Sequence, residues 1–155
     1  MMSSPSAYML ETDRQVHVMY QSTRLLTLSN FNCTYTSGVH GNYSTSYLVL
    51  NIDDNKRLLL GDIVIDKGKL QLSPLLEKHV RKNRGLKKNQ ALNGTGSLFE
   101  NKIEANDNFC LTSKGIGFSY APYEIAPYST GEVNIFISFA SMKGLLKPAF
   151  KKLIQ

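Results

Sequence analysis

The chain has 155 residues, a length typical of one domain, and 42% of them are hydrophobic, which excludes a largely disordered protein. No apolar run approaches the roughly 18 residues needed to cross a membrane, so we predict no membrane span in this chain. Lys and Arg number 18 against 12 Asp and Glu, which gives a net charge of +6.

The positive charge is concentrated between Glu77 and Glu100, where no acidic residue occurs. Such a basic stretch binds nucleic acid, an anionic polymer or an acidic partner, or it is a solvated helix face. Aromatic residues that stack on bases are absent nearby, the closest being Phe99. We therefore predict a solvated face and no nucleic-acid partner, and leave open a weak attraction to an anionic polymer. The six cations are Lys78, Arg81, Lys82, Arg84, Lys87 and Lys88.

The first half of the chain is predicted to form a leader followed by strands. Residues 1–13 are Ser-rich and lack the apolar core of a signal peptide, so we expect a disordered leader and a single domain over residues 14–155. Apolar and polar residues then alternate as in strands, with a slip near Ser29 that indicates a bulge. The strand-like segments are Val16–Val18, Leu26–Tyr35, Thr45–Ile52, Leu58–Leu60 and Ile63–Ile65, with turns at Ser37–Gly41 and Asp53–Asn55.

The clearest helix begins at Ser73-Pro74, because Ser suits the N-cap and Pro the first helical position. Gly85 is placed to end it, and a second short helix is expected around Leu98–Ala105. The last third returns to strands, with a hairpin, one further strand and a final helical turn that Pro148 stops or restarts. These segments are Phe109–Thr112, Ile116–Tyr120, Val133–Ile137 and Ser141–Leu146. The pattern predicts an α+β domain, a mainly antiparallel sheet packed against one or two helices.

Catalytic and metal-binding patterns are weak in this sequence. There is no Gly-x-Ser-x-Gly elbow, no His spacing typical of a zinc site and no phosphate loop. We therefore predict a protein that is not an enzyme and that uses no metal or cofactor. Two cysteines, Cys33 and Cys110, are too few for a disulfide scaffold, and we favour free thiols over a single bridge.

Two local features are candidates for function. His40 lies in the Gly-rich break at residues 37–41, where a structural role is favoured over a catalytic one. The segment Ala121–Gly131 contains Ala-Pro-Tyr twice, and each Pro fixes its own φ and extends the preceding residue. A stiff segment of this kind presents Tyr123 and Tyr128 for recognition, or packs them over a sheet edge.

The two features also form motifs in a fixed order along the chain. Ser37-Gly38-Val39-His40-Gly41 comes first, and Tyr123-Glu124-Ile125-Ala126-Pro127-Tyr128 follows, with Gly131 after it. This order resembles the uncharacterised exported domain shared by RsiV-type anti-sigma factors and PdaC-type peptidoglycan deacetylases. In that family the motifs usually read Gly-Gly-Ala-His-Gly and close to Tyr-Glu-Ile-Ala-Pro-Tyr. The resemblance covers about Val16 to Leu146, and the first motif departs from it at Ser37 and Val39.

The resemblance implies an extracytoplasmic bacterial domain, in the periplasm or at the cell surface, that is often lipid-anchored in the full-length protein. In the deacetylases, catalysis belongs to a separate domain that is absent here, and in the anti-sigma factor the exported domain binds lysozyme. The region that usually precedes the domain is short or missing in this chain. The motif positions carried over are His40, Gly41, Tyr123, Glu124, Pro127, Tyr128 and Gly131, none of them as a catalytic residue.

Three hypotheses follow for function. The leading one is a non-enzymatic cell-envelope domain that binds a protein, such as a lysozyme-type muramidase, or peptidoglycan, through its Tyr/Pro-rich loop. The second is a peptidoglycan-acting hydrolase or transferase with His40 and Glu124 as general base and acid. The third is a structural spacer. The net charge of +6 opposes an encounter with a basic muramidase.

Overall fold

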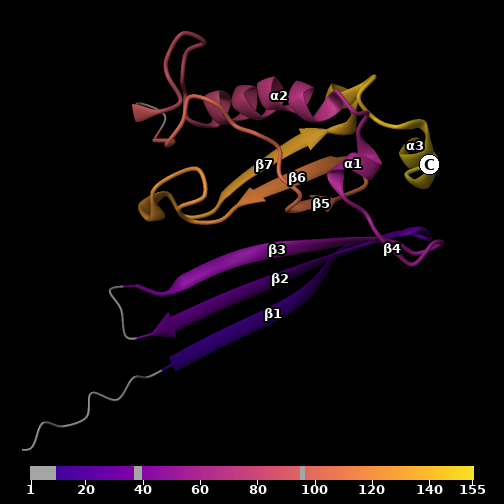
Figure 1. Ribbon diagram of the computed structural model, residues 1–155, viewed down its shortest axis with the longest axis horizontal. Helices are drawn as coiled ribbons and strands as arrows, with labels where there is room; N and C mark the ends of the chain where they lie inside the picture. The colour runs from indigo at the N-terminus through magenta and orange to yellow at the C-terminus, as the bar shows by residue number, and fades with distance from the viewer. Residues whose placement is uncertain (1–9, 37–39, 95–96) are drawn as a thin grey trace, which may run out of the picture.

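A computed structural model of the chain describes residues 10–36, 40–94 and 97–155. It contains two antiparallel sheets, one ordered β1-β2-β3-β4 and one ordered β5-β6-β7. The two sheets form successive layers, and the long helix α2 lies over the second of them (Figure 1). The predicted α+β class is confirmed. The elements are β1 (Leu10–Gln21), β2 (Leu25–Thr36), β3 (Asn42–Asn51), β4 (Lys56–Arg57), α1 (Leu60–Ile63), α2 (Gly68–Asn83), β5 (Phe109–Leu111), β6 (Gly115–Tyr120), η2 (Tyr128–Thr130), β7 (Val133–Ser138), η3 (Phe139–Met142) and α3 (Pro148–Leu153).

The first sheet follows the predicted alternation of apolar and polar residues, but its β-bulge does not lie where the sequence predicted it. β2 and β3 pair without a break from Leu25 opposite Asn51 onward. The register shift lies in β1 between Val18 and Tyr20, so the bulge expected near Ser29 is wrong. Ser29 is buried on the face toward the second sheet. The break in the apolar/polar alternation near Ser29 therefore marks a buried polar residue and not a residue inserted into the strand.

The expected leader is partly wrong, because β1 begins at Leu10. Residues 10–13 pair with residues 33–36 of β2. β1 is exposed along almost its whole length. Its polar start is compatible with an edge strand that faces water on both sides. Residues 1–9 of the expected leader lie outside the described part of the chain.

The long helix α2 begins at Gly68, five residues before the expected N-cap Ser73. The Ser73 hydroxyl instead donates a hydrogen bond to the carbonyl of Ile103. Pro74 therefore lies inside the helix and not at its first position. The predicted C-terminal end is confirmed, because the helix stops at Asn83 and Gly85 adopts a φ of +63°.

Three other short segments differ from expectation. The strand-like segment around Leu60 and Ile63 forms the helix α1, since these two residues are both fully buried at helical spacing. The helix expected at 98–105 is absent, and this segment is irregular chain tied to Ile125 by the amide of Phe99. The final helical turn is η3, and Pro148 starts α3, so it restarts the helix. The predicted hairpin and last strand are confirmed as β5-β6 and β7.

The hydrophobic core lies between the two sheets and between the second sheet and α2. It includes Leu25 and Val49 from the first sheet, Phe109, Phe118 and Ile135 from the second, and Leu72, Leu76 and Val80 from the helix. Both cysteines are free thiols in the structure, Cys33 in β2 and Cys110 in β5. Within the described residues, no helix is both long and apolar enough to cross a membrane.

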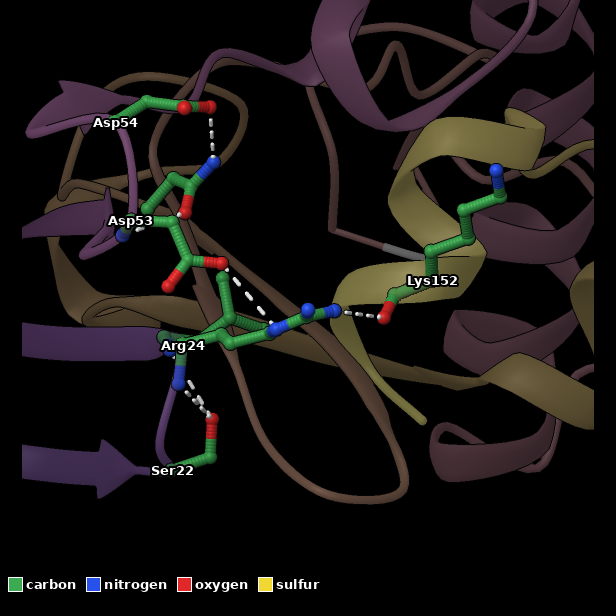
Figure 2. A network of polar contacts seen from close by, with 7 residues as sticks. Ser22, Arg24, Asp53, Asp54 and Lys152 are labelled. Carbon is green, nitrogen blue, oxygen red and sulfur yellow. Dashed lines mark hydrogen bonds and ion pairs between the residues drawn. The ribbon is translucent and has the colours of Figure 1, made fainter.

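An exposed polar network connects the C-terminal helix to the first sheet (Figure 2). The Arg24 guanidinium lies 3.2 Å from a carboxylate oxygen of Asp53 and donates to the carbonyl of Lys152 at 2.9 Å. Ser22 accepts the backbone N–H of Arg24 at 3.3 Å. Because these groups are largely exposed, we assign the network an orienting role and little net stability.

The side-chain amide of Asn108 is one of the links between the two sheets. β4 pairs with β3 only at Leu50 and Asn51, so the outer edge of β3 has no strand partner further along. There Asn108 accepts the N–H of Tyr47 at 2.9 Å and donates to the carbonyl of Thr45 at 2.9 Å. The amide thus substitutes for the peptide group of a missing strand.

We expect Asn108→Ala to destabilise the protein by about 2 to 4 kcal/mol, because it leaves the backbone groups on β3 without partners. Urea unfolding followed by circular dichroism measures this change. Asn134→Ala is the matched control, since Asn134 is exposed on β7, and its effect should stay within about 0.5 kcal/mol. Equal effects of the two substitutions would contradict the bridging role of Asn108.

Candidate functional site

The Tyr- and Pro-rich segment, residues 121–131, is held in shape by its own backbone. Glu124 N donates to the carbonyl of Ala121 at 3.0 Å, and Tyr123 N donates to that of Ala126 at 3.1 Å. The helix η2 follows directly. The stiffness expected from the two prolines therefore has a hydrogen-bonded basis in the structure.

Tyr123 stands at the tip of the first turn in a rarely used conformation. Its φ is +70°, which for a bulky residue other than Gly costs conformational energy. Its side chain nevertheless remains 58% exposed. The turn therefore holds an aromatic ring in solvent, where packing gives it little stabilisation.

Tyr123 belongs to a group of rings that we call the aromatic cluster, His40, Tyr43, Tyr123 and Tyr128. The His40 and Tyr128 rings stack, with centroids 3.7 Å apart and an interplanar angle of 18°. Tyr123 lies 5.6 Å from Tyr128, and Tyr43 meets Tyr128 edge-on at 5.8 Å. The Tyr128 hydroxyl donates to the carbonyl of Gly41 at 2.6 Å. His40 and Gly41 of the first motif thus meet Tyr128 of the second motif, which lies 87 residues after Gly41.

Gly131 and Pro127 shape the chain around η2. Gly131 has a φ of +73°, and a Cβ there would lie 3.3 Å from the Tyr43 hydroxyl. Pro127 caps η2, and its carbonyl accepts the N–H of Thr130 at 2.9 Å. These two motif residues therefore have structural roles that place Tyr128 and leave room for Tyr43.

The Glu124 carboxylate has its hydrogen-bond partners outside the aromatic cluster. Its carboxylate accepts the N–H of Ala121 at 2.8 Å and the side-chain amide of Asn106 at 3.0 Å. Both oxygens are thus used to close the turn and to tie it to the chain before β5. This is the arrangement of a structural carboxylate.

The geometry does not pair His40 with Glu124. Glu124 lines a cavity of about 350 Å³ with Lys102, Glu104 and Tyr120, and His40 is not among the lining residues. Across residues 10–36, 40–94 and 97–155, no hydrogen bond joins His40 to Glu124. In the same ranges no three His, Cys, Asp or Glu side chains are grouped to hold a metal ion.

Three residues outside the sequence motifs belong to the cluster or hold the segments that carry it: Tyr43, Asn106 and Glu132. Tyr43 contributes a ring, and Asn106 holds Glu124. The Glu132 carboxylate accepts the hydroxyl of Thr45 at 3.0 Å and also its backbone N–H. Tyr43 stands close to Gly41 in the sequence, which is the only signal that could have identified it. The roles of Asn106 and Glu132 depend on contacts made by the folded chain.

Gly131→Ala should destabilise the protein and displace the Tyr43 ring, because it combines a strained φ with a close contact. Gly144→Ala is the matched control, since Gly144 also has a positive φ, +83°, but its Cβ would meet nothing within 4 Å. We expect a loss of about 1 to 3 kcal/mol for Gly131→Ala, with altered Tyr ring signals by NMR. Unchanged ring signals would contradict this role.

The Tyr128 hydrogen bond predicts a pH dependence of stability. Burial raises the pKa of the Tyr128 phenol, and Tyr43, Cys33 and Tyr123 add to the rise. A raised pKa means that the folded state favours the protonated phenol, so its contribution is complete below roughly pH 10 and is lost as the pH rises through the raised value. Tyr128→Phe should be less stable at pH 7, and its stability should fall less steeply above pH ~10.

Thermal unfolding at pH 7 to 11 measures this dependence, with Tyr35→Phe, an exposed tyrosine on β2, as the control. Parallel pH profiles for wild type and Tyr128→Phe would show that the phenol is not linked to folding in this way.

Two solved structures are similar in fold to this chain. The chain is similar to a crystal structure of a DUF3298 family member from Bacteroides fragilis NCTC 9343, with 28% identity and a TM-score of 0.87, over 97% of this chain and 61% of that one. A DUF3298 family protein from Pseudomonas aeruginosa PAO1 shares the fold at 18% identity, with a TM-score of 0.73, over 91% of this chain and 64% of that one. The chain thus spans about three fifths of these relatives. No curated protein matches it.

The family assignment follows from the matched residues. The model of the family described as "Protein of unknown function (DUF3298)" matches residues 61–140. This range includes the second motif with Tyr123, Glu124 and Tyr128, and it ends before η3 is complete. His40 lies outside this range. The chain belongs to the DUF3298 family of proteins of unknown function.

Proposed function

We propose that this chain is a non-enzymatic domain of the bacterial cell envelope that binds a protein partner through the aromatic cluster. The observation that carries the proposal is Tyr123, an exposed ring held on a strained and hydrogen-bonded turn. Strain that persists in a fold is often associated with function, because the surrounding contacts must maintain it. A ring fixed before binding also loses little entropy when a partner covers it.

The chemistry of the cluster fits protein recognition. Tyrosine is enriched at the energetic centres of interfaces because it buries a large area with few rotatable bonds. The stacked His40–Tyr128 pair lies beside Tyr123, whose ring centroid is 6.3 Å from that of His40 and 5.6 Å from that of Tyr128. The five cavities described in this structure are lined by other residues. A surface of rings outside a cavity favours a protein over a small enclosed substrate.

The location and the partner class rest on the resemblance to RsiV- and PdaC-type exported domains. An extracytoplasmic domain, lipid-anchored in longer proteins, would meet envelope proteins and peptidoglycan. A lysozyme-type muramidase is one such protein, although the net charge of +6 would slow its encounter with this chain at low salt. Peptidoglycan is the second candidate, because sugar rings also pack on tyrosine faces.

The proposal that the domain is not an enzyme is supported by the use of Glu124. Its two oxygens close a turn, which leaves the hydrolase or transferase hypothesis without a free acid beside His40. A spacer role would leave the exposure and strain of Tyr123 without an explanation.

The test is a comparison of Tyr123→Ala with Phe136→Ala, which removes a similarly exposed ring from β7. Each protein is immobilised and exposed to envelope proteins, and separately to purified peptidoglycan, then washed at high salt. We expect a protein that the wild type and Phe136→Ala retain and that Tyr123→Ala retains at least about tenfold less, a change of about 1.4 kcal/mol. The retained protein is then purified and its Kd measured for all three chains.

If the wild type retains peptidoglycan but no protein, and Tyr123→Ala does not retain peptidoglycan, the cluster binds glycan and not a protein. Equal retention by wild type and Tyr123→Ala would contradict a recognition role for the cluster. All three chains must first show the same thermal unfolding, because a misfolded variant would also lose binding.

A further inference from the structure

A groove runs along the exposed side of α2, away from the aromatic cluster. At its C-terminal end it widens to about 630 Å³ and is lined by Lys78, Arg81, Lys82 and Lys88, with Pro74 and Leu86 between them and Glu77 as the only carboxylate. Toward the start of the helix it continues as a hollow of about 540 Å³ that shares Pro74 and Glu77. The two hollows therefore adjoin each other along the helix.

The wall of the cationic end is held in place by hydrogen bonds. The Arg81 guanidinium donates to the carbonyl of Lys87 at 3.2 Å and also to that of Gln90. The Gln90 side chain in turn accepts the N–H of Lys87 at 2.6 Å. These bonds fix the loop after α2, which carries Lys88, against the helix. The groove is thus a built feature and not a chance gap between mobile side chains.

The cations at the C-terminal end of this groove, Lys78, Arg81, Lys82 and Lys88, form no ion pair in the described part of the chain. The five ion pairs there involve Arg24, Lys56, Lys69, Lys102 and Lys147. None of them involves a cation of the basic stretch between Glu77 and Glu100. The positive charge of the chain therefore remains uncompensated at one end of the groove, where it can attract an anionic group.

The other end of the groove differs in character. Leu70 is 78% exposed there, the highest exposure among the large hydrophobic residues described. Its lining holds Lys69 and Lys102 together with the carboxylates of Asp66, Glu77 and Glu104, so it has no excess of positive charge. Leu70, Pro74 and Ala105 supply its apolar surface. The groove therefore runs from a cationic end to an end that has apolar surface and no excess of positive charge.

We propose that this groove binds a single-chain anionic amphiphile. Its phosphate or carboxylate head would lie against Lys78, Lys82 and Lys88, and its aliphatic chain would run toward Leu70. Unpaired ammonium groups match an anionic head, and the apolar hollow matches the chain. The path from Lys82 back to Leu70 covers twelve residues of helix, about 18 Å. This proposal does not depend on the function of the aromatic cluster.

Dodecyl phosphate, kept below its micelle-forming concentration, is the probe. Binding is measured by calorimetry and located by NMR shifts of the amides of α2 and its following loop. Dodecyl maltoside carries the same chain without charge, and inorganic phosphate carries the head without the chain. We expect dodecyl phosphate to bind at least about tenfold more tightly than either, a difference of about 1.4 kcal/mol. Its affinity should also fall as salt is added.

The variant Lys78→Gln/Lys82→Gln/Lys88→Gln should weaken dodecyl phosphate binding about tenfold. The matched control, Lys114→Gln/Lys143→Gln/Lys151→Gln, removes the same charge from exposed lysines on other elements and should leave the Kd within about twofold. Leu70→Gln should weaken dodecyl phosphate binding without changing that of inorganic phosphate. Leu70 is exposed, so its replacement leaves the core intact.

Four outcomes would overturn the proposal. Equal binding of inorganic phosphate would show a site for the anion alone, and equal binding of the maltoside would show a purely apolar groove. Tighter binding of a single-stranded oligonucleotide than of dodecyl phosphate would identify a polyanion surface. Equal losses in the groove variant and the control would show that the net charge of +6, and not the groove, attracts the ligand.

Discussion

The fold depends on the side-chain amide of Asn108, which completes the open edge of β3. Because unpaired backbone groups inside a protein are costly, the second sheet stays attached where this amide satisfies Tyr47 and Thr45. Two residues earlier in the same segment, Asn106 binds the carboxylate of Glu124. One short stretch before β5 thus fixes both the packing of the two sheets and the turn that carries Tyr123. The candidate site is positioned by the same contacts that join the layers.

The loop that carries the aromatic cluster makes further contacts with the start of β3, next to those of Asn108. Tyr128 reaches the carbonyl of Gly41, and Glu132 reaches Thr45, so the loop after β6 is bonded to the start of β3 in two places. These bonds account for the rigidity of the cluster but not for the exposure of Tyr123. A ring that is ordered, strained and still open to solvent is the feature that the binding proposal explains.

The two proposed surfaces use different physical principles. The cluster offers ring faces held before binding, so its affinity would come from buried area at low entropic cost. The α2 groove offers localised positive charge beside an apolar hollow, so its affinity would depend on salt and on chain length. The two lie on different segments, residues 40–43 with 121–131 and residues 69–105. The two sets of variants change different residues, so the two proposals are tested separately.

The sequence by itself determined the strands and the class of the fold, because alternation and turn residues act locally. β2, β3, β7 and the β5-β6 hairpin follow from such patterns, as does the end of α2 at Gly85. Tertiary structure decided the start of α2, since Ser73 bonds to Ile103 instead of capping a helix. It also decided the site: the sequence marked His40 and Tyr128 as separate motifs, whereas Tyr43, Asn106 and Glu132 had no pattern of their own. Their roles arise from hydrogen bonds and ring contacts between segments far apart in the chain, which no local period encodes.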